Sequence, residues 1–336
     1  MLKTQTVVLF MALLLLIGCG GSEIKTPAEI GTAFPESRYL TAEGSGQTEI
    51  EARQRALAEL SAIFESRVHA ETTSFARSAI GPDNDELFEK NVESKIAIIS
   101  SVRLTGAKIG RVWRDGASSG GYHALAVIDR SRTGRNWAAE LETVTAQTEA
   151  EVKNLEYTTG RFRRMLALNR VVVGLLKKQV LESRLRVLNY PARSSLDVDI
   201  NTITAELARL RSELRFFVNF SGESGQVVAD RISEAFTANG LLMGNSRDEA
   251  DALINGQVAT QPLSLNNPRA QFVRALATVK VIETGTGAVV ATLNESVRKG
   301  HVDQAEAARK AVATLSDTLA ERLISEIGFG GDDATD

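Results

Sequence analysis

A stretch of helical spacing over residues 133–188 constrains the fold of this chain more than any other feature. Its apolar side chains recur every three or four residues, as they do along one face of a helix. They are Trp137, Leu141, Val144, Val152, Leu155, Phe162, Leu166, Val173, Leu176, Val180 and Leu185. Thr158, Thr159 and Gly160 interrupt the pattern. It therefore predicts either two helices of about 25 residues folded back on each other, or one long helix that pairs with another chain.

The part of the chain before this stretch predicts a small α+β domain over residues 37–132. A strand over residues 37–46 ends in a Gly-Ser-Gly triplet at 44–46, and Thr48 and Glu51 then form a capping box ahead of a helix. Three further strands follow as a meander, over residues 96–104, 109–113 and 122–128. One strand, one helix and three more strands make a compact α+β domain.

The part of the chain after Tyr190 and Pro191 predicts a second α+β domain, over residues 191–329. A leading helix is followed by the order β-α-β-β-β-α, which fits two helices on one face of a mostly antiparallel sheet. The expected elements are helices at 200–214 and 226–239, strands at 216–220, 252–260, 271–283 and 288–297, and a final helix capped by Asp303 and Glu306. The Thr-Gly-Thr-Gly sequence at 284–287 joins the last two strands as a hairpin. With an acidic tail over residues 330–336, the fold class is α+β: two small α+β domains joined by a long helical segment.

The composition excludes several classes of function. The 39 Lys and Arg residues against 42 Asp and Glu residues give a net charge of −3, so no positive excess is present to bind nucleic acid. Three histidines and one cysteine leave little material for zinc, haem, iron–sulfur or thiol chemistry. The single Gly-x-Ser-x-Gly sequence, at residues 116–120, lies in a glycine-rich turn between two expected strands and not between a strand and a helix, so it does not predict a nucleophile elbow. We therefore expect no catalytic residues, no metal and no cofactor.

The histidines and the glycine triplet are the first residues to weigh as binding sites. His69, His123 and His301 lie far apart in the sequence, so none has a second histidine at ligand spacing. The triplet at 44–46 lies between a strand and a helix, where free backbone amides can bind an anion. It lacks the third glycine of a dinucleotide loop and the Lys of a phosphate loop. A tight strand-to-helix turn therefore explains it better.

Three groups of charged residues are also candidates: Asp197 with Asp199 and Asp332 with Asp333, residues 129–132, and Arg161 with Arg163 and Arg164. The paired carboxylates are expected to be solvated loop charges, because nothing apolar surrounds them to raise a pKa. The Asp-Arg-Ser-Arg sequence at 129–132 is either a polar surface for a partner or, as we favour, the cap of the following helix. The three arginines could contact anionic lipid or glycan, but a solvated face is favoured.

The N-terminus contains a short apolar run that ends at a cysteine. Lys3 precedes an apolar run over residues 7–18, which is shorter than the ~20 residues of a membrane span and has the form of a signal peptide. The run ends in Leu16-Ile17-Gly18-Cys19, and Cys19 is the only cysteine of the chain. This sequence resembles the bacterial lipobox, which implies a thioether-linked diacylglycerol on Cys19 and cleavage between Gly18 and Cys19. Two or more acyl chains bind a membrane stably.

The predicted mature chain begins with a lipidated tether over residues 19–36, after a signal peptide over residues 1–18. The tether is rich in small residues and contains Pro27 and Pro35. Gly20 stands where an Asp commonly signals retention in the inner membrane. We therefore expect an anchor in the outer membrane, with the chain on its periplasmic face.

Two segments together form a recognisable pattern. They are Arg38-Tyr39-Leu40-Thr41-Ala42-Glu43-Gly44-Ser45-Gly46, followed by an alanine-rich helix, and Tyr122-His123-Ala124-Leu125-Ala126-Val127-Ile128-Asp129-Arg130. They resemble the LPP-twenty lipoprotein family. The resemblance covers about residues 36–190. It implies an envelope lipoprotein without known catalysis, and, because related domains occur in a flagellar outer-membrane collar protein, a role in assembling an envelope structure. The C-terminal half has only a fold-level likeness to envelope-assembly lipoproteins, including an activator of a peptidoglycan synthase.

These observations favour a non-catalytic outer-membrane lipoprotein that acts through protein contacts in cell-envelope assembly or maintenance. Its partners would be the membrane, through the lipid anchor, and envelope proteins, with self-association through residues 133–190 and no nucleic acid. One alternative is an activator of a peptidoglycan synthase that docks through its C-terminal domain. Another is a small-ligand or lipid carrier, which requires an apolar pocket of ~300 Å³ or more.

Overall fold

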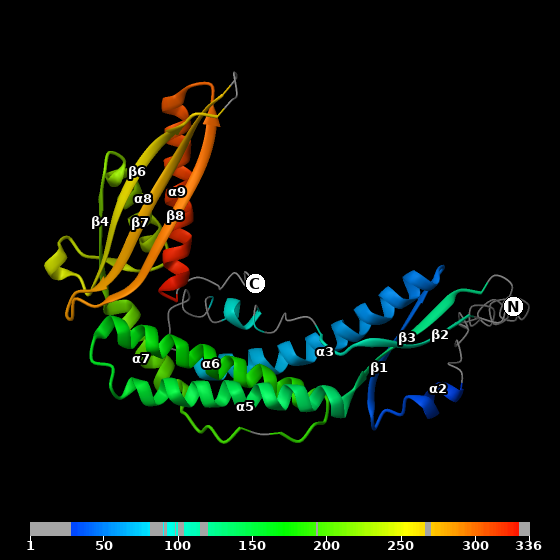
Figure 1. Cartoon of the computed structure of the whole chain (residues 1–336). Helices are drawn as coiled ribbons and strands as arrows, with labels where there is room; N and C mark the ends of the chain where they lie inside the picture. Colours follow the sequence, from blue (N-terminus) through cyan, green and yellow to red (C-terminus); the bar gives the residue numbers. More distant parts are fainter. Residues whose placement is uncertain are drawn as a thin grey trace, which may run out of the picture. The chain divides into compact units, whose positions relative to one another are not determined.

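The computed structural model describes residues 28–80, 90, 93–97, 99, 104–114, 120–192, 194–265 and 270–328 (Figure 1). The chain divides into two compact units. The N-terminal unit is Met1–Leu60 with Gly106–Arg130, and the C-terminal unit is Ser61–Thr105 with Ser131–Asp336. Each unit combines helices with a sheet, so the α+β fold class is confirmed.

A three-stranded antiparallel sheet forms the N-terminal unit, with the strand order β1-β3-β2. Its elements are α2 (Ala28–Ala33), β1 (Tyr39–Gly46), β2 (Lys108–Arg114), β3 (Tyr122–Asp129) and the first part of α3 (Glu49–Ile80). The central strand β3 is buried on both faces. Leu125 and Val127 pack against Ile30 of α2, and Gly44 of β1, which lies opposite Ala124, faces α3.

The turn into α3 has the capping box that the sequence predicts. Thr48 Oγ1 accepts a hydrogen bond from the backbone N of Glu51 at 3.2 Å, and the Glu51 carboxylate accepts one from the backbone N of Gln47 at 2.9 Å. A Cβ at Gly44 would lie 2.1 Å from the backbone N of Ala56. The triplet at 44–46 thus lies within β1 and not in the predicted tight turn, and Gly44 is needed for close packing of the strand on the helix.

Two expectations for the N-terminal half are wrong. Residues 93–97 and 99 are helical, although the alternating pattern over residues 96–104 predicts a strand. Ile96 is 1% exposed and belongs to the core of the C-terminal unit, so tertiary packing outweighs the local pattern. The tether expected over residues 19–36 is also too long, because residues 28–33 form α2 and Ile30 is buried against the sheet.

The long helical stretch is a hairpin in the C-terminal unit, made of α5 (Arg130–Leu155) and α6 (Arg161–Val187). Arg170 pairs with Glu151 at 3.1 Å, and the Arg184 guanidinium lies 5.8 Å from the centre of the Trp137 ring. Arg184 lies fourteen residues after Arg170 in α6, whereas its partner Trp137 lies fourteen residues before Glu151 in α5. The two helices are therefore antiparallel. Of the two predicted arrangements, the helical hairpin is confirmed.

A five-stranded sheet follows, with the order β5-β4-β6-β7-β8. Its elements are α7 (Ile200–Glu213), β4 (Arg215–Ser221), α8 (Gly225–Ala238), β5 (Leu242–Met243), the 3₁₀ turn η1 (Arg247–Glu249), β6 (Ala252–Leu263), β7 (Gln271–Glu283), β8 (Val289–His301) and α9 (Gln304–Glu326). β4 is parallel to β5 and β6, whereas β6, β7 and β8 are antiparallel. Helices α8 and α9 pack on each other and on one face of the sheet, as predicted (Figure 1).

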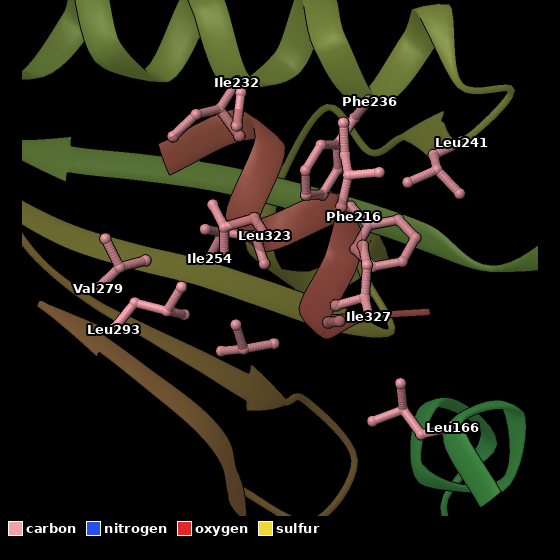
Figure 2. Packing of buried hydrophobic residues seen from close by; sticks show 14 of the residues in the cluster. Leu166, Phe216, Ile232, Phe236, Leu241, Ile254, Val279, Leu293, Leu323 and Ile327 are labelled. Carbon is pink, nitrogen blue, oxygen red and sulfur yellow. The ribbon is translucent and has the colours of Figure 1, made fainter. Parts of the chain in front are cut away.

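One continuous core joins the helical hairpin to this sheet. Phe162 of α6 meets Phe216 of β4 edge-to-face, with ring centres 5.7 Å apart, and Phe216 meets Phe236 of α8 at 5.4 Å. Leu166 of α6 belongs to the same buried cluster (Figure 2). The sequence places a domain boundary near Tyr190, whereas the structure groups the chain on both sides of it in one unit.

Candidate functional site

The predicted lipidation site lies outside the described residues. Cys19, and Gly18 on the other side of the expected cleavage point, precede the first described residue. Asp332 and Asp333 of the tail also lie outside them. The other candidate residues, which are the histidines and the remaining charged groups, lie within the described part of the chain.

The three arginines form ion pairs with the sheet and with helix α7, at a place that we call the arginine junction: Gly160, Arg161, Arg163, Arg164, Glu206, Glu213, Asp251 and Glu283. Arg163 donates to Glu283 twice, from its backbone N at 3.1 Å and from Nε at 2.7 Å. The Glu283 side chain is only 3% exposed. The negative charge of the Glu283 carboxylate at the start of α6 also interacts favourably with the positive end of the helix dipole.

The flanking arginines complete the junction. Arg161 Nη1 lies 3.0 Å from Asp251 Oδ1, and its Nη2 lies 2.9 Å from Glu213 Oε2. Arg164 binds both carboxylate oxygens of Glu206 and donates to the backbone O of Leu155 at 3.0 Å. All three arginines therefore have carboxylate partners within the chain, and the Arg161 side chain is still half exposed, as a solvated face requires.

Two carboxyl groups of the junction have lowered pKa values. Burial raises the pKa of Glu283, but hydrogen bonds from Thr286 and Arg163 outweigh burial and hold the pKa below its ordinary value of 4.5. The hydrogen bond from Arg164 lowers the pKa of Glu206 in the same way and outweighs its partial burial. Both groups thus bind their proton less readily in the folded chain than in the unfolded one.

The junction should therefore weaken in acid. A group with a lowered folded pKa adds stability above its unfolded pKa and loses it as the pH falls through the folded value. We expect the free energy of unfolding to fall from about pH 5 downward, and to fall less steeply in Glu283→Gln. Urea unfolding between about pH 6 and about pH 3 measures both slopes. Parallel slopes for the two proteins would show that Glu283 does not carry the effect.

The histidines occupy three separate environments. His123 stacks on Trp113 within the N-terminal unit, with ring centres 5.5 Å apart, and His69 is exposed on α3. His301 Nδ1 accepts a hydrogen bond from the backbone N of Asp303 at 3.2 Å. Among the described residues, no three His, Cys, Asp or Glu side chains gather as a metal site would require.

Asp129 and Asp199 have structural partners, whereas Asp197 is exposed in the segment before α7. Asp129 pairs with Arg38 at 3.2 Å. Asp199 caps α7, where its carboxylate accepts from the backbone N of Asn201 at 3.0 Å and from Thr202 Oγ1 at 2.6 Å. The Thr202 and Asn201 hydrogen bonds lower the pKa of Asp199. Asp199 is therefore exposed to solvent, as predicted, and it also caps a helix.

A groove of about 690 Å³ lies along the helical hairpin. Most of the side chains that line it are polar or charged, and Lys95 Nζ there donates to Asn169 Oδ1 at 2.9 Å. This lining does not match the apolar pocket that a lipid carrier needs. Within the described part of the chain, no helix combines the length and the apolar composition needed to cross a membrane.

Comparison with known proteins gives no family. No family model matches the sequence, and no curated protein matches it. The structure is similar to a minor lipoprotein from Acinetobacter baumannii (13% identity, 34% of this chain, 93% of the other, TM-score 0.29). It is also similar to a lipoprotein from Neisseria meningitidis (9% identity, 33% of this chain, 99% of the other, TM-score 0.24). A third similar structure is a secreted protein from Helicobacter pylori (12% identity, 86% of this chain, 97% of the other, TM-score 0.35). TM-scores this low carry no argument about fold or function.

Proposed function

We propose that this chain is a lipid-anchored protein of the bacterial cell envelope that acts through contacts with other envelope proteins rather than by catalysis. The observation that carries the proposal is the Leu16-Ile17-Gly18-Cys19 sequence at the end of a short apolar run, in a chain with no other cysteine. A thioether-linked diacylglycerol at Cys19 would hold the chain at a membrane surface. Outer-membrane sorting, on the periplasmic face, is part of the proposal because Gly20 follows the cysteine.

The charged side chains of the arginine junction support a role in protein–protein contacts rather than in catalysis. The cations and carboxylates of the arginine junction hold helix α6 against the sheet and against helix α7. Glu206 and Glu283 have lowered pKa values and are each held by an arginine, which favours a structural role over that of a general acid or base. The apolar side chains of α6 are already buried within this chain. Partner proteins would therefore bind at the exposed faces of the two units.

Metabolic labelling with palmitate tests the proposal. The chain should carry label and sediment with membranes, whereas Cys19→Ser should carry none and should remain unprocessed or be released. Gly20→Asp is the matched control, because it should keep the label and move the chain toward the inner-membrane fraction. Absence of label from the unsubstituted chain would refute the anchor.

A further inference from the structure

The face of the five-stranded sheet that points away from α8 and α9 presents an ordered array of polar side chains, which we call the polar grid. The grid is made of Asn255, Gln257, Ala259 and Gln261 of β6, Arg274, Leu276, Thr278 and Lys280 of β7, and Thr292, Asn294, Ser296 and Arg298 of β8. Strand pairing sets these residues in four rows across three strands. Ten of the twelve are exposed, and Asn255 and Leu276 are half-buried. The grid measures about 20 Å along the strands and about 10 Å across them.

The grid carries positive charge without any negative charge. Its charged members are Arg274, Lys280 and Arg298, and no Asp or Glu belongs to it. The chain as a whole has slightly more acidic than basic residues, so this separation is local. Strand alternation accounts for it, because Glu283 and Glu295 point to the opposite face, where they pair with Arg163 and Arg322.

Two arginines stand directly opposite each other in the grid. Arg274 and Arg298 are register partners in the antiparallel pair of β7 and β8. Their Cβ atoms are therefore about 5 Å apart, a distance at which like charges repel and destabilise a sheet. Within the described residues, neither guanidinium makes an ion pair that would relieve this repulsion. An anion between the two would relieve it, and a guanidinium pair is well shaped to grip a carboxylate.

Apart from Ala259 and Leu276, the uncharged residues of the grid all carry hydrogen-bonding side chains. Four amides and three hydroxyls surround the cations, and Thr278 Oγ1 donates to Asn294 Oδ1 at 2.9 Å. The centre of a protein–protein interface is usually apolar and rich in aromatic residues. Here the central rows contain only Ala259 and Leu276 as apolar residues. A hydrated, hydroxyl-rich partner that also carries carboxylates fits this face better than a folded acidic protein does.

From this geometry we infer that the polar grid binds a carboxylate-bearing glycan strand. The Arg274–Arg298 pair holds one carboxylate, Lys280 attracts a second, and the amides and hydroxyls between them bond to sugar hydroxyls. Lys280 lies three rows from Arg274, about 20 Å along β7, so the ligand is extended rather than a single sugar. The inference adds a ligand class to the proposed envelope role, but it does not depend on lipid at Cys19.

Fluorescence anisotropy of the full chain in detergent, with labelled oligogalacturonate as the probe, tests the inference. Arg274→Gln with Arg298→Gln should weaken binding at least tenfold. Arg247→Gln with Lys310→Gln removes the same charge from exposed positions elsewhere in the C-terminal unit, and should change the affinity less than twofold. The melting temperature of the Arg274/Arg298 variant should be no lower than that of the unsubstituted chain, because a repulsive pair is removed.

Further probes separate the possible ligands. Neutral maltohexaose should bind at least tenfold more weakly than oligogalacturonate, since it lacks carboxylates. Polyglutamate of the same charge should also bind more weakly. Equal or tighter binding of polyglutamate would overturn the glycan assignment in favour of an acidic protein. The site would be overturned if oligogalacturonate did not bind, or if it bound the Arg274/Arg298 variant as tightly as the unsubstituted chain. Failure of palmitate labelling would refute only the lipid anchor.

Discussion

Phe216→Ala should cost about 3–5 kcal/mol of the free energy of unfolding, the range for removing a buried aromatic ring. Phe216 is fully buried between Phe162 of α6 and Phe236 of α8. Because both rings touch it, the loss should weaken the helical hairpin and the sheet together. Hydrogen exchange should show amides of α6 and of the sheet losing protection in the same variant.

Phe272→Ala is the matched control for this experiment. The Phe272 ring is half-buried on the outer face of the sheet, where it lies against Gly300. Its removal should cost about 1 kcal/mol or less. Unchanged protection of α6 in Phe216→Ala, with protection lost in the sheet, would contradict a shared core and would restore a domain boundary near Tyr190.

Gly160→Ala should cost about 2 kcal/mol, through loss of the arginine junction. The backbone of Gly160, with φ −81° and ψ 137°, suits alanine. The added Cβ, however, would lie 1.9 Å from Glu283 Oε1, so the carboxylate would have to leave Arg163. Urea unfolding of the variant near neutral pH measures the cost.

Two further variants test whether the cost comes from Glu283. In a Glu283→Ala background the clash is gone, so Gly160→Ala should be nearly neutral there, and the two substitutions should not add. Gly285→Ala in the nearby β7–β8 turn has nothing within 4 Å of its new Cβ and should change stability little. Additive costs for Gly160→Ala and Glu283→Ala would show that the two positions do not interact.

Much of the fold could be predicted from short-range patterns. The Asp303 cap, whose carboxylate accepts from the backbone N of Ala305 at 2.8 Å, and the turn at 284–287 both depend on neighbouring residues, and both are present. The strand predicted over residues 96–104 is wrong because Ile96 packs in a core whose other residues are distant in the sequence. Local alternation could not reveal that core.

The arginine junction shows the same limit. The cluster at 161–164 is visible in the sequence, but Glu283 lies 120 residues from Arg163. A signal was nevertheless present, because the helix-facing positions of β7 read Val273, Ala275, Ala277, Val279, Val281 and Glu283. A carboxylate in an otherwise apolar row predicts a buried partner. Which arginine supplies it depends on how the chain folds back.

Strand β7 carries opposite charges on its two faces, and this fixes its alignment with its neighbours. Sliding β7 by one residue would turn every side chain to the other side. Glu283 would then lose Arg163 and enter water, while Arg274 and Lys280 would be forced beneath α9 without counterions. Misaligned pairing is thus penalised by charge as well as by lost apolar packing, so a hairpin with long strands has one alignment that it can tolerate.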